Sequence, residues 1–123
     1  MKAFLDTSSL IKLYHQEEGS DSVMKALSSD IKEIFLSELA ILEFRSAIWK
    51  KISDRNNFQW IMLQSDIVDS ASHLLMKYGG LGLRTLDSLQ LAAALTLRDD
   101  ECVFLTSDKL LRTLFKEERL NVL

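Results

Sequence analysis

Two aspartates stand where short apolar runs of the sequence end. Asp6 follows the run "AFL", and Asp108 closes the stretch "VFLTSD". Both runs have the length and composition of buried strands, and adjacent parallel strands bring such ends to one edge of a sheet. For either aspartate alone, the simpler interpretation is a cap on the helix that follows. Together they indicate two carboxylates at the edge where α/β sheets bind ligands.

A third acid, Glu43, lies in a stretch that is otherwise mostly apolar. Its helical neighbours three and four positions away carry no charge: Leu39, Ala40, Ser46 and Ala47. The carboxylate therefore either reaches the rim of the protein or lies in a crowded, partly dry environment. In the second case an unpaired charge would cost several kcal/mol. An ion pair with Lys50, on roughly the same side of the helix, is the structural alternative.

A fourth acid, Asp87, opens the stretch "TLDSLQLAAAL". Thr85 can serve as the N-cap of a helix here, which would place Asp87 in the first turn, where the helix dipole favours an anion. That interpretation needs no functional site. The run of small residues at 92–94 predicts close packing of this helix, which would hold Asp87 near the edge of the sheet.

Four carboxylates at one cleft would repel each other by about 4 kcal/mol for each close pair. Protonation of some of them, with raised pKa values, would relieve this repulsion. A hard divalent cation relieves it better, and all-oxygen ligands suit Mg²⁺ or Mn²⁺. Carboxylates that hold such ions are typical of sites that hydrolyse phosphodiesters. The hydroxyls that flank the aspartates would then orient them, and these belong to Thr7, Ser8, Thr106 and Ser107.

The elements that must position these acids alternate between strands and helices. Apolar runs predict strands at 2–5, 33–37, 58–63, 102–106 and 120–123, and helical periodicity predicts helices at 8–19, 20–30, 38–52, 65–80, 85–100 and 107–115. We expect Ser8 or Ser9 to cap the first helix, Ser37 the third, and Gly79-Gly80 to end the helix at 65–80. The alternation predicts an α/β protein with a parallel sheet that is covered on both faces.

Composition sets the broader limits. With 123 residues, of which 47% are hydrophobic, the chain is expected to form one globular domain over residues 1–123. The formal net charge of −3 argues against a broad basic face, although acids neutralised by a cation would distort this sum. The single cysteine, Cys102, excludes an internal disulfide and is interpreted as a small buried apolar residue. Without a membrane span or a signal peptide, the simplest location is the cytoplasm.

Taken in order, the four acidic motifs resemble those of a known family. They are "FLDTSSL", "ELAILEF", "LRTLDSLQLAAAL" and "FLTSDKLL", and they contain Asp6, Glu43, Asp87 and Asp108. This set resembles the PIN-domain ribonucleases, most closely the VapC-type toxins of bacterial and archaeal toxin–antitoxin pairs. No single motif is specific, but the order of all four in a chain of this size is.

The resemblance implies a PIN-like three-layer α/β/α fold with a central parallel sheet, and an endoribonuclease that depends on Mg²⁺ or Mn²⁺. It assigns catalytic and metal-binding roles to Asp6, Glu43, Asp87 and Asp108, and supporting hydroxyl roles to Ser8 and Thr106. It also implies a homodimer that is silenced by a cognate antitoxin protein. The candidate contacts to the RNA substrate are Arg84, Lys109 and Arg112.

One stretch departs from the family pattern, and two classes of protein remain as alternatives. Between Glu43 and Asp87 the family usually fits a further helix, whereas "KKISDRNNFQWIML" passes from helix to strand almost directly. A non-catalytic PIN-like binding module would carry the same fold. A receiver-type phosphoacceptor domain would need a pair of adjacent acids after the first strand, and Thr7 follows Asp6. A haloacid-dehalogenase-like phosphatase would need an aspartate where Ser8 stands.

Overall fold

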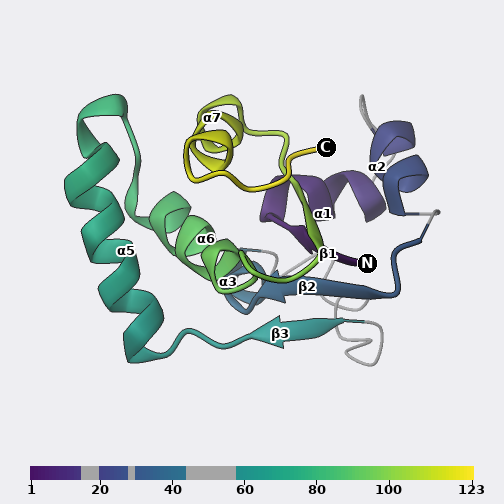
Figure 1. Ribbon diagram of the computed structural model, residues 1–123, viewed down its shortest axis with the longest axis horizontal. Coiled ribbons are helices and arrows are strands. Elements are labelled where there is room, and N and C mark those ends of the chain that lie inside the picture. The colour runs from purple at the N-terminus through teal and green to yellow at the C-terminus, as the bar shows by residue number, and fades with distance from the viewer. Residues whose placement is uncertain (15–19, 28–29, 44–57) are drawn as a thin grey trace.

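The protein is built on a four-stranded sheet whose strands are all parallel (Figure 1). The computed structural model describes residues 1–14, 20–27, 30–43 and 58–123. The strands are β1 (Lys2–Leu5), β2 (Glu33–Ser37), β3 (Gln59–Ile61) and β4 (Cys102–Leu105), in the order β3-β2-β1-β4. Because β1 and β4 are neighbours, with Leu5 opposite Leu105, the segments that follow them start at the same edge. This confirms the predicted parallel sheet.

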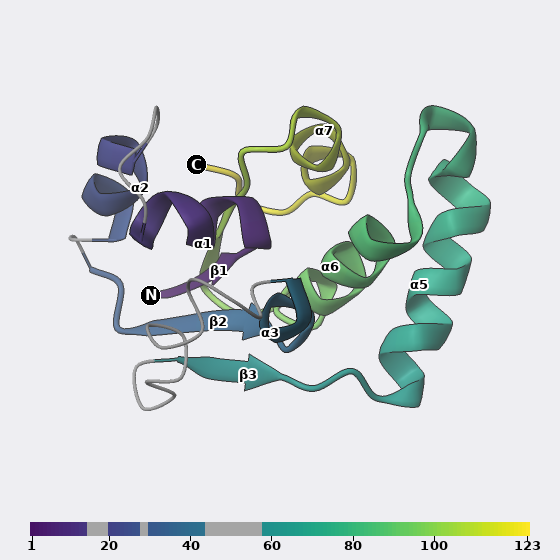
Figure 2. The same ribbon diagram turned by 180° about the vertical axis from the view of Figure 1, so that it is seen from behind.

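Helices connect the strands and cover the sheet. They are α1 (Thr7–Tyr14), α2 (Ser20–Leu27), α3 (Leu39–Glu43), α5 (Ser65–Tyr78), α6 (Thr85–Leu95) and α7 (Lys109–Glu117), with a short 3-10 turn η2 (Gly79–Leu81) after α5. Figure 2 shows α3 at the end of β2 and beside α6, with which it is in contact. The predicted helix at 38–52 is described only up to Glu43. Its later part, Lys50, and the stretch that departs from the family pattern as far as residue 57 lie outside the described residues.

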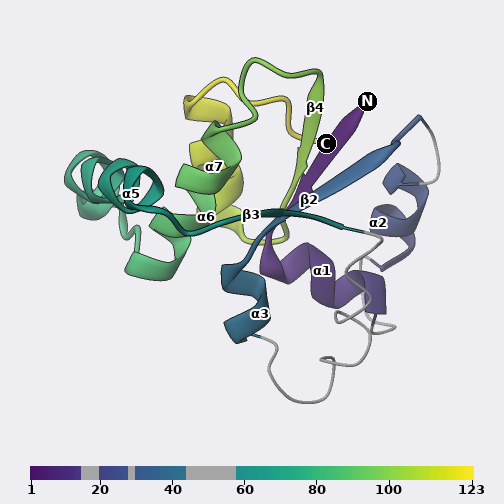
Figure 3. The same cartoon turned by 90° about the horizontal axis from the view of Figure 1, so that it is seen from below.

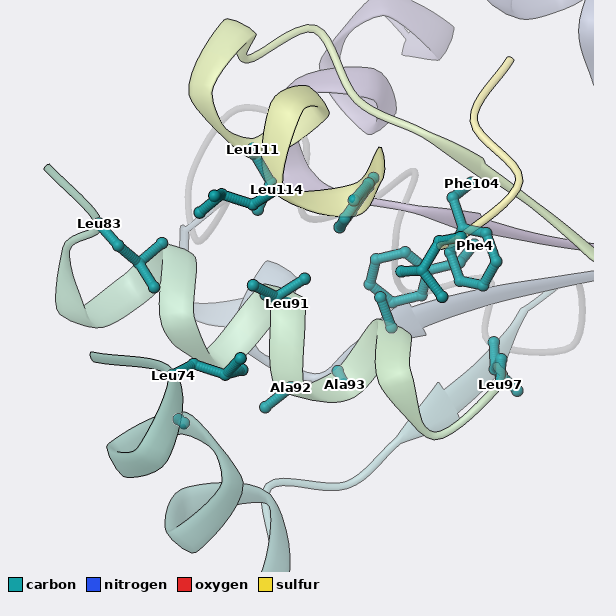
Figure 4. Packing of buried hydrophobic residues seen from close by; sticks show 14 of the residues in the cluster. Phe4, Leu74, Leu83, Leu91, Ala92, Ala93, Leu97, Phe104, Leu111 and Leu114 are labelled. Carbon is teal, nitrogen blue, oxygen red and sulfur yellow. The ribbon is translucent and has the colours of Figure 1, made fainter. Parts of the chain in front are cut away.

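Each face of the sheet has its own apolar core, because successive side chains of a strand point to opposite faces. Phe4 of β1 joins Phe104 and Phe115 in the core beneath α5, α6 and α7 (Figure 4). Leu5, one residue later, packs in the other core with Leu10 of α1. Figure 3 shows α6 and α7 on one side of the sheet and α1 and α2 on the other. The architecture is therefore the three-layer α/β/α arrangement that the sequence predicts.

The starts of two helices differ from the predictions. Helix α1 begins at Thr7, and its first turn is capped by Asp6, whose Oδ1 accepts a hydrogen bond of 3.0 Å from the backbone N–H of Ser9. Neither Ser8 nor Ser9 is the cap, because Asp6 precedes both and already accepts the free N–H of the first turn. Helix α6 includes Thr85 as its first residue, and the extended residue before it, Arg84, makes no side-chain cap bond. The predicted cap of α3 by Ser37 is confirmed in part, since the Ser37 hydroxyl accepts the N–H of Leu39 at 3.2 Å.

The last predicted strand also differs. The predicted last strand makes only an isolated parallel bridge, between Val122 and Phe104, because the chain crosses the edge of the sheet at this single point. The helix α5 ends at Tyr78 with Gly79 as its C-cap, as the Gly79-Gly80 pair predicts. The turn η2 follows and closes at Gly82, whose φ of 101° is the left-handed conformation that glycine adopts without strain. Among the described residues, no helix is long and apolar enough to span a membrane.

Candidate metal-dependent active site

Asp6 lies at the centre of the sheet edge and is almost completely buried, with 3% of its surface exposed. Its Oδ1 accepts hydrogen bonds from the Ser8 hydroxyl at 2.7 Å and from the Ser9 N–H at 3.0 Å, and its Oδ2 accepts one from the Thr106 hydroxyl. Burial raises the pKa of Asp6, and the hydrogen bonds from Thr106, Ser9 and Ser8 lower it only in part. The site therefore holds a carboxylate whose negative charge is not fully compensated by the protein.

The hydroxyl residues form a connected frame around this carboxylate. Ser8 Oγ also accepts the N–H of Ser107 at 2.9 Å, and Thr106 Oγ1 accepts the N–H of Asp108 at 3.1 Å. The start of α1 is thereby fixed to the turn after β4. Ser107 takes part through its backbone N–H; the prediction that its hydroxyl orients an acid has no contact that supports it among the described residues.

Glu43 reaches the same edge from the last described residue of α3. Its side chain is exposed, which resolves the two sequence interpretations in favour of a position at the rim. Its Oε1 accepts a hydrogen bond from the Thr7 hydroxyl and a second, of 3.3 Å, from Nε2 of Gln90. The carboxylate is therefore tied to both α1 and α6, although α3 and these two helices are far apart in the sequence.

Asp87 and Asp108 complete the set from two further elements. Asp87 lies in the first turn of α6, as predicted, and is half-buried. Burial raises its pKa, and the charges of Asp108 and Glu43 raise it further, whereas Arg84 lowers it. Asp108 is exposed and caps α7, accepting the N–H of Leu111 at 2.8 Å. The capping interpretation of Asp6 and Asp108 is therefore correct. It does not compete with a functional one, since an ionised carboxylate has about four acceptor sites and Asp6 uses three of them.

All four acids line one cavity of about 210 Å³. The other described residues of its wall are Thr7, Ser8, Leu86, Gln90 and Leu111, so no lysine, arginine or histidine among the described residues lines it. Four elements supply the acids: the ends of β1 and β4, the helix α3 and the start of α6. The convergence follows from the adjacency of β1 and β4 and from the contact of α3 with α6.

The residues of this cavity fit a hard divalent cation by their chemistry. Carboxylate, hydroxyl and amide oxygens are the ligands that Mg²⁺ and Mn²⁺ prefer. Burial raises the pKa of Asp87, and the negative charges of Asp108 and Glu43 raise it further, so a positive ligand would favour its ionised form. As the side chains stand, no group of three acidic, histidine or cysteine residues in the described part of the chain is close enough to hold an ion. The assignment of Asp6, Glu43, Asp87 and Asp108 as ligands thus remains a prediction.

Gln90 is the residue of this site that the sequence interpretation missed. It lies on α6 three residues after Asp87, and it is 4% exposed. Positions three apart share one face of a helix, so a glutamine on the face of Asp87, in a helix that is otherwise mainly apolar, was the available signal. Its contact with Thr7 and Glu43 depends on the tertiary structure.

The basic residues lie around the cavity and not in it. Arg84 and Lys109 are exposed beside Asp87 and Asp108 in the sequence. Arg112 is half-buried, and its Nη1 donates to the backbone oxygen of Leu123 at 2.7 Å. It lines a second cavity of about 210 Å³ together with Lys12, Ser9, Thr106 and Ser107, among other residues. Ser8 lines the acidic cavity and accepts the N–H of Ser107, which lines the basic one, at 2.9 Å, so the two cavities are neighbours.

The comparisons with known proteins agree with this fold. The profile of the PIN domain family matches residues 3–114, and the protein belongs to this family. The receiver-type and phosphatase alternatives are thereby excluded. A search of the curated proteins found no match to the chain.

Three solved structures have a similar fold. A toxin–antitoxin complex from Klebsiella pneumoniae has a chain 22% identical to this one, with a TM-score of 0.65 over 83% of this chain and 84% of that one. FitAcB from Neisseria gonorrhoeae has 15% identity and a TM-score of 0.70, covering 98% and 95%. VapBC2 from Rickettsia felis, bound to a DNA fragment from their promoter, has 12% identity and a TM-score of 0.62, covering 100% and 98%. These likenesses show the fold.

Proposed function

We propose that this protein is a metal-dependent endoribonuclease that hydrolyses RNA phosphodiester bonds. The observation that carries the proposal is the cavity in which Asp6, Glu43, Asp87 and Asp108 come together without a cationic side chain among its described lining residues. Membership of the PIN family and the resemblance of the four acidic motifs to its ribonucleases support the same reaction class.

Asp6, Glu43, Asp87 and Asp108 would hold Mg²⁺ or Mn²⁺. A bound cation of this kind lowers the pKa of a water ligand and neutralises charge on the phosphate. The chain's own residues supply the frame: Ser8 and Thr106 fix both oxygens of Asp6 by hydrogen bonds. Burial disfavours the ionised form of Asp6, so a positive ligand would stabilise its carboxylate.

The second cavity supports a path for the RNA backbone. Arg112 and Lys12 place two positive charges in its wall, with hydroxyls from Ser9 and Ser107. A strand whose scissile phosphate lies at the acidic cavity would reach this basic cavity over the contact between Ser107 and Ser8. Among the three candidate RNA contacts, Arg112 is therefore the one that lines a described cavity in which the RNA backbone could bind. Arg84 and Lys109 are exposed and would act from the rim.

We further propose that the protein is the VapC-type toxin of a toxin–antitoxin pair. The similar solved structure from Klebsiella pneumoniae is a toxin–antitoxin complex, and this supports a cognate antitoxin partner. A homodimer and a cytoplasmic location belong to the same proposal.

Cleavage of RNA by the purified chain tests the enzymatic part of the proposal. We expect cleavage with Mg²⁺ or Mn²⁺, none with EDTA, and a loss of at least about 100-fold in rate for Asp6→Asn. Asp69→Asn is the matched control, because Asp69 is an exposed aspartate of α5 that does not line the cavity. Equal activity of Asp6→Asn and the control would contradict the mechanism. A chain that binds RNA and Mn²⁺ but cuts nothing would instead be a non-catalytic binding module.

A further inference from the structure

Gln90 joins three helices at the acidic cavity. Its Nε2 donates to Thr7 Oγ1 at 2.7 Å and to Glu43 Oε1 at 3.3 Å, and the Thr7 hydroxyl donates to the same oxygen of Glu43. One oxygen of an exposed carboxylate is thus held by two donors from α1 and α6. The other oxygen, Oε2, accepts no hydrogen bond from the described residues, so a ligand in the cavity can bind it.

The orientation of the Gln90 amide follows from its neighbours. A carboxylate can only accept hydrogen bonds, so the nitrogen of the amide, and not its oxygen, must face Glu43. The opposite orientation would place two oxygens with partial or full negative charge against each other. With the nitrogen so placed, Oε1 of Gln90 is buried and has no hydrogen-bond partner among the described residues.

A buried acceptor without a partner lowers the stability of a protein. An apolar side chain of similar size would avoid this cost at position 90, which is 4% exposed and lies in a largely apolar helix. The hydrogen bond from Nε2 to Glu43 offers little stability in return, because Glu43 is exposed and water can replace it. Packing alone therefore does not account for a glutamine here.

We infer that Gln90 is a positioning residue of the metal site: with Thr7 it holds Oε1 of Glu43 so that Oε2 is oriented toward a divalent cation. This inference rests on the proposed function, since Glu43 must be a ligand for its orientation to matter. A ligand that is already oriented loses less side-chain freedom when the cation binds. Partners that orient ligands in this way commonly change metal affinity when they are removed.

The affinity of the purified chain for Mn²⁺, measured by calorimetry without RNA, tests the inference. Gln90→Met keeps the length and shape of the side chain and removes both polar groups. We expect it to bind Mn²⁺ about 10–100-fold more weakly than the wild type. Gln64→Met is the matched control, because Gln64 is exposed and its side chain makes no cap bond at the start of α5. The control is expected to bind Mn²⁺ as the wild type does.

The melting temperature without metal separates positioning from a structural role. We expect Gln90→Met to melt at the same temperature as the wild type or higher, because it removes the unpartnered Oε1. A purely structural cross-link would show the reverse: a lower melting temperature with unchanged affinity for Mn²⁺. That result, or a Gln90→Met chain that does not fold, would overturn the inference.

A double-mutant cycle with Glu43→Ala shows whether Gln90 acts through Glu43. In this background the acceptor is gone, so Gln90→Met should weaken Mn²⁺ binding by less than about twofold. Equal losses in both backgrounds would overturn the inference. If the wild type binds no Mn²⁺, the proposed function and the inference both fail; if it binds Mn²⁺ and Gln90→Met binds it equally well, only the inference fails.

Discussion

Glu118 is an ionisable residue whose carboxylate is held by three hydrogen-bond donors from other parts of the chain. It follows α7, and its carboxylate accepts hydrogen bonds from Lys77 Nζ at 2.8 Å, from the Tyr78 hydroxyl and from Arg98 Nη2 at 2.6 Å. Burial by itself raises the pKa of Glu118, but these three partners outweigh it and lower the pKa from 4.5 to about 2. The contacts join α5, the turn after α6 and the end of α7. We therefore expect Glu118→Gln to destabilise the fold.

The size of the effect follows from the shift in pKa. One pKa unit corresponds to about 1.4 kcal/mol, so the lowering of the pKa of Glu118 from 4.5 to about 2 sets an upper limit of about 3 kcal/mol. The side chains of Lys77 and Arg98 are 60% and 45% exposed, and water and salt screen their charges. We expect a loss of about 1–2 kcal/mol in the free energy of unfolding near neutral pH. The melting temperature should fall by about 3–8 °C.

The pH dependence gives the loss a signature. Because the folded-state pKa of Glu118 is depressed, its contribution is complete above the ordinary pKa of 4.5 and is lost as the pH falls toward about 2. Urea titrations give the free energy of unfolding of the wild type and of Glu118→Gln. The difference between the two should be less than half as large at about pH 3 as at about pH 7. Glu117→Gln is the control, since Glu117 is exposed, and it should stay within about 0.5 kcal/mol. A cost that is equal for both variants, or constant with pH, would refute the reasoning.

Four further outcomes are expected. Without metal, Asp6→Asn should be as stable as the wild type or more stable, and its advantage should grow as the pH rises above 3.8. Burial raises the folded-state pKa of Asp6, so the folded wild type loses stability as this group ionises. Denaturant unfolding at a series of pH values measures the difference. Mn²⁺ should raise the melting temperature of the wild type and not that of Asp6→Asn. Burial raises the pKa of Cys102 to about 11, so its thiol should react with a thiol reagent only as the chain unfolds, and fast labelling of the folded protein would contradict this. Arg112→Gln should raise the KM for RNA with little change in kcat if this residue binds the RNA backbone, and an unchanged KM would exclude it.

Local patterns in the sequence were sufficient to predict most of the fold. The buried runs before Asp6 and Asp108 predicted parallel strands, and these strands pair in the structure with Leu5 opposite Leu105. The helical periodicity around Asp87 placed it in the first turn of α6. These predictions succeed because burial on both faces of a strand, or on one face of a helix, leaves a direct trace in the order of apolar residues.

The caps and chain ends were predicted less well. Whether Asp6 or one of the following serines caps α1 depends on where the backbone turns, and all three side chains have a suitable oxygen. The apolar stretch at 120–123 makes only one bridge, through Val122, because its pairing depends on where the chain leaves α7. Short-range sequence does not encode such choices, which differ by small free energies.

The amino-acid sequence by itself determined which residues can bear negative charge beside a sheet: Asp6, Glu43, Asp87 and Asp108 were identified from their types and positions. Only the tertiary structure decided that they line one cavity and that Gln90 and Thr7 bind Glu43 there. The physical reason is the range of the forces involved. Apolar burial repeats along the chain at the period of its element, whereas hydrogen bonds between residues 36 to 83 positions apart arise only after the helices have packed.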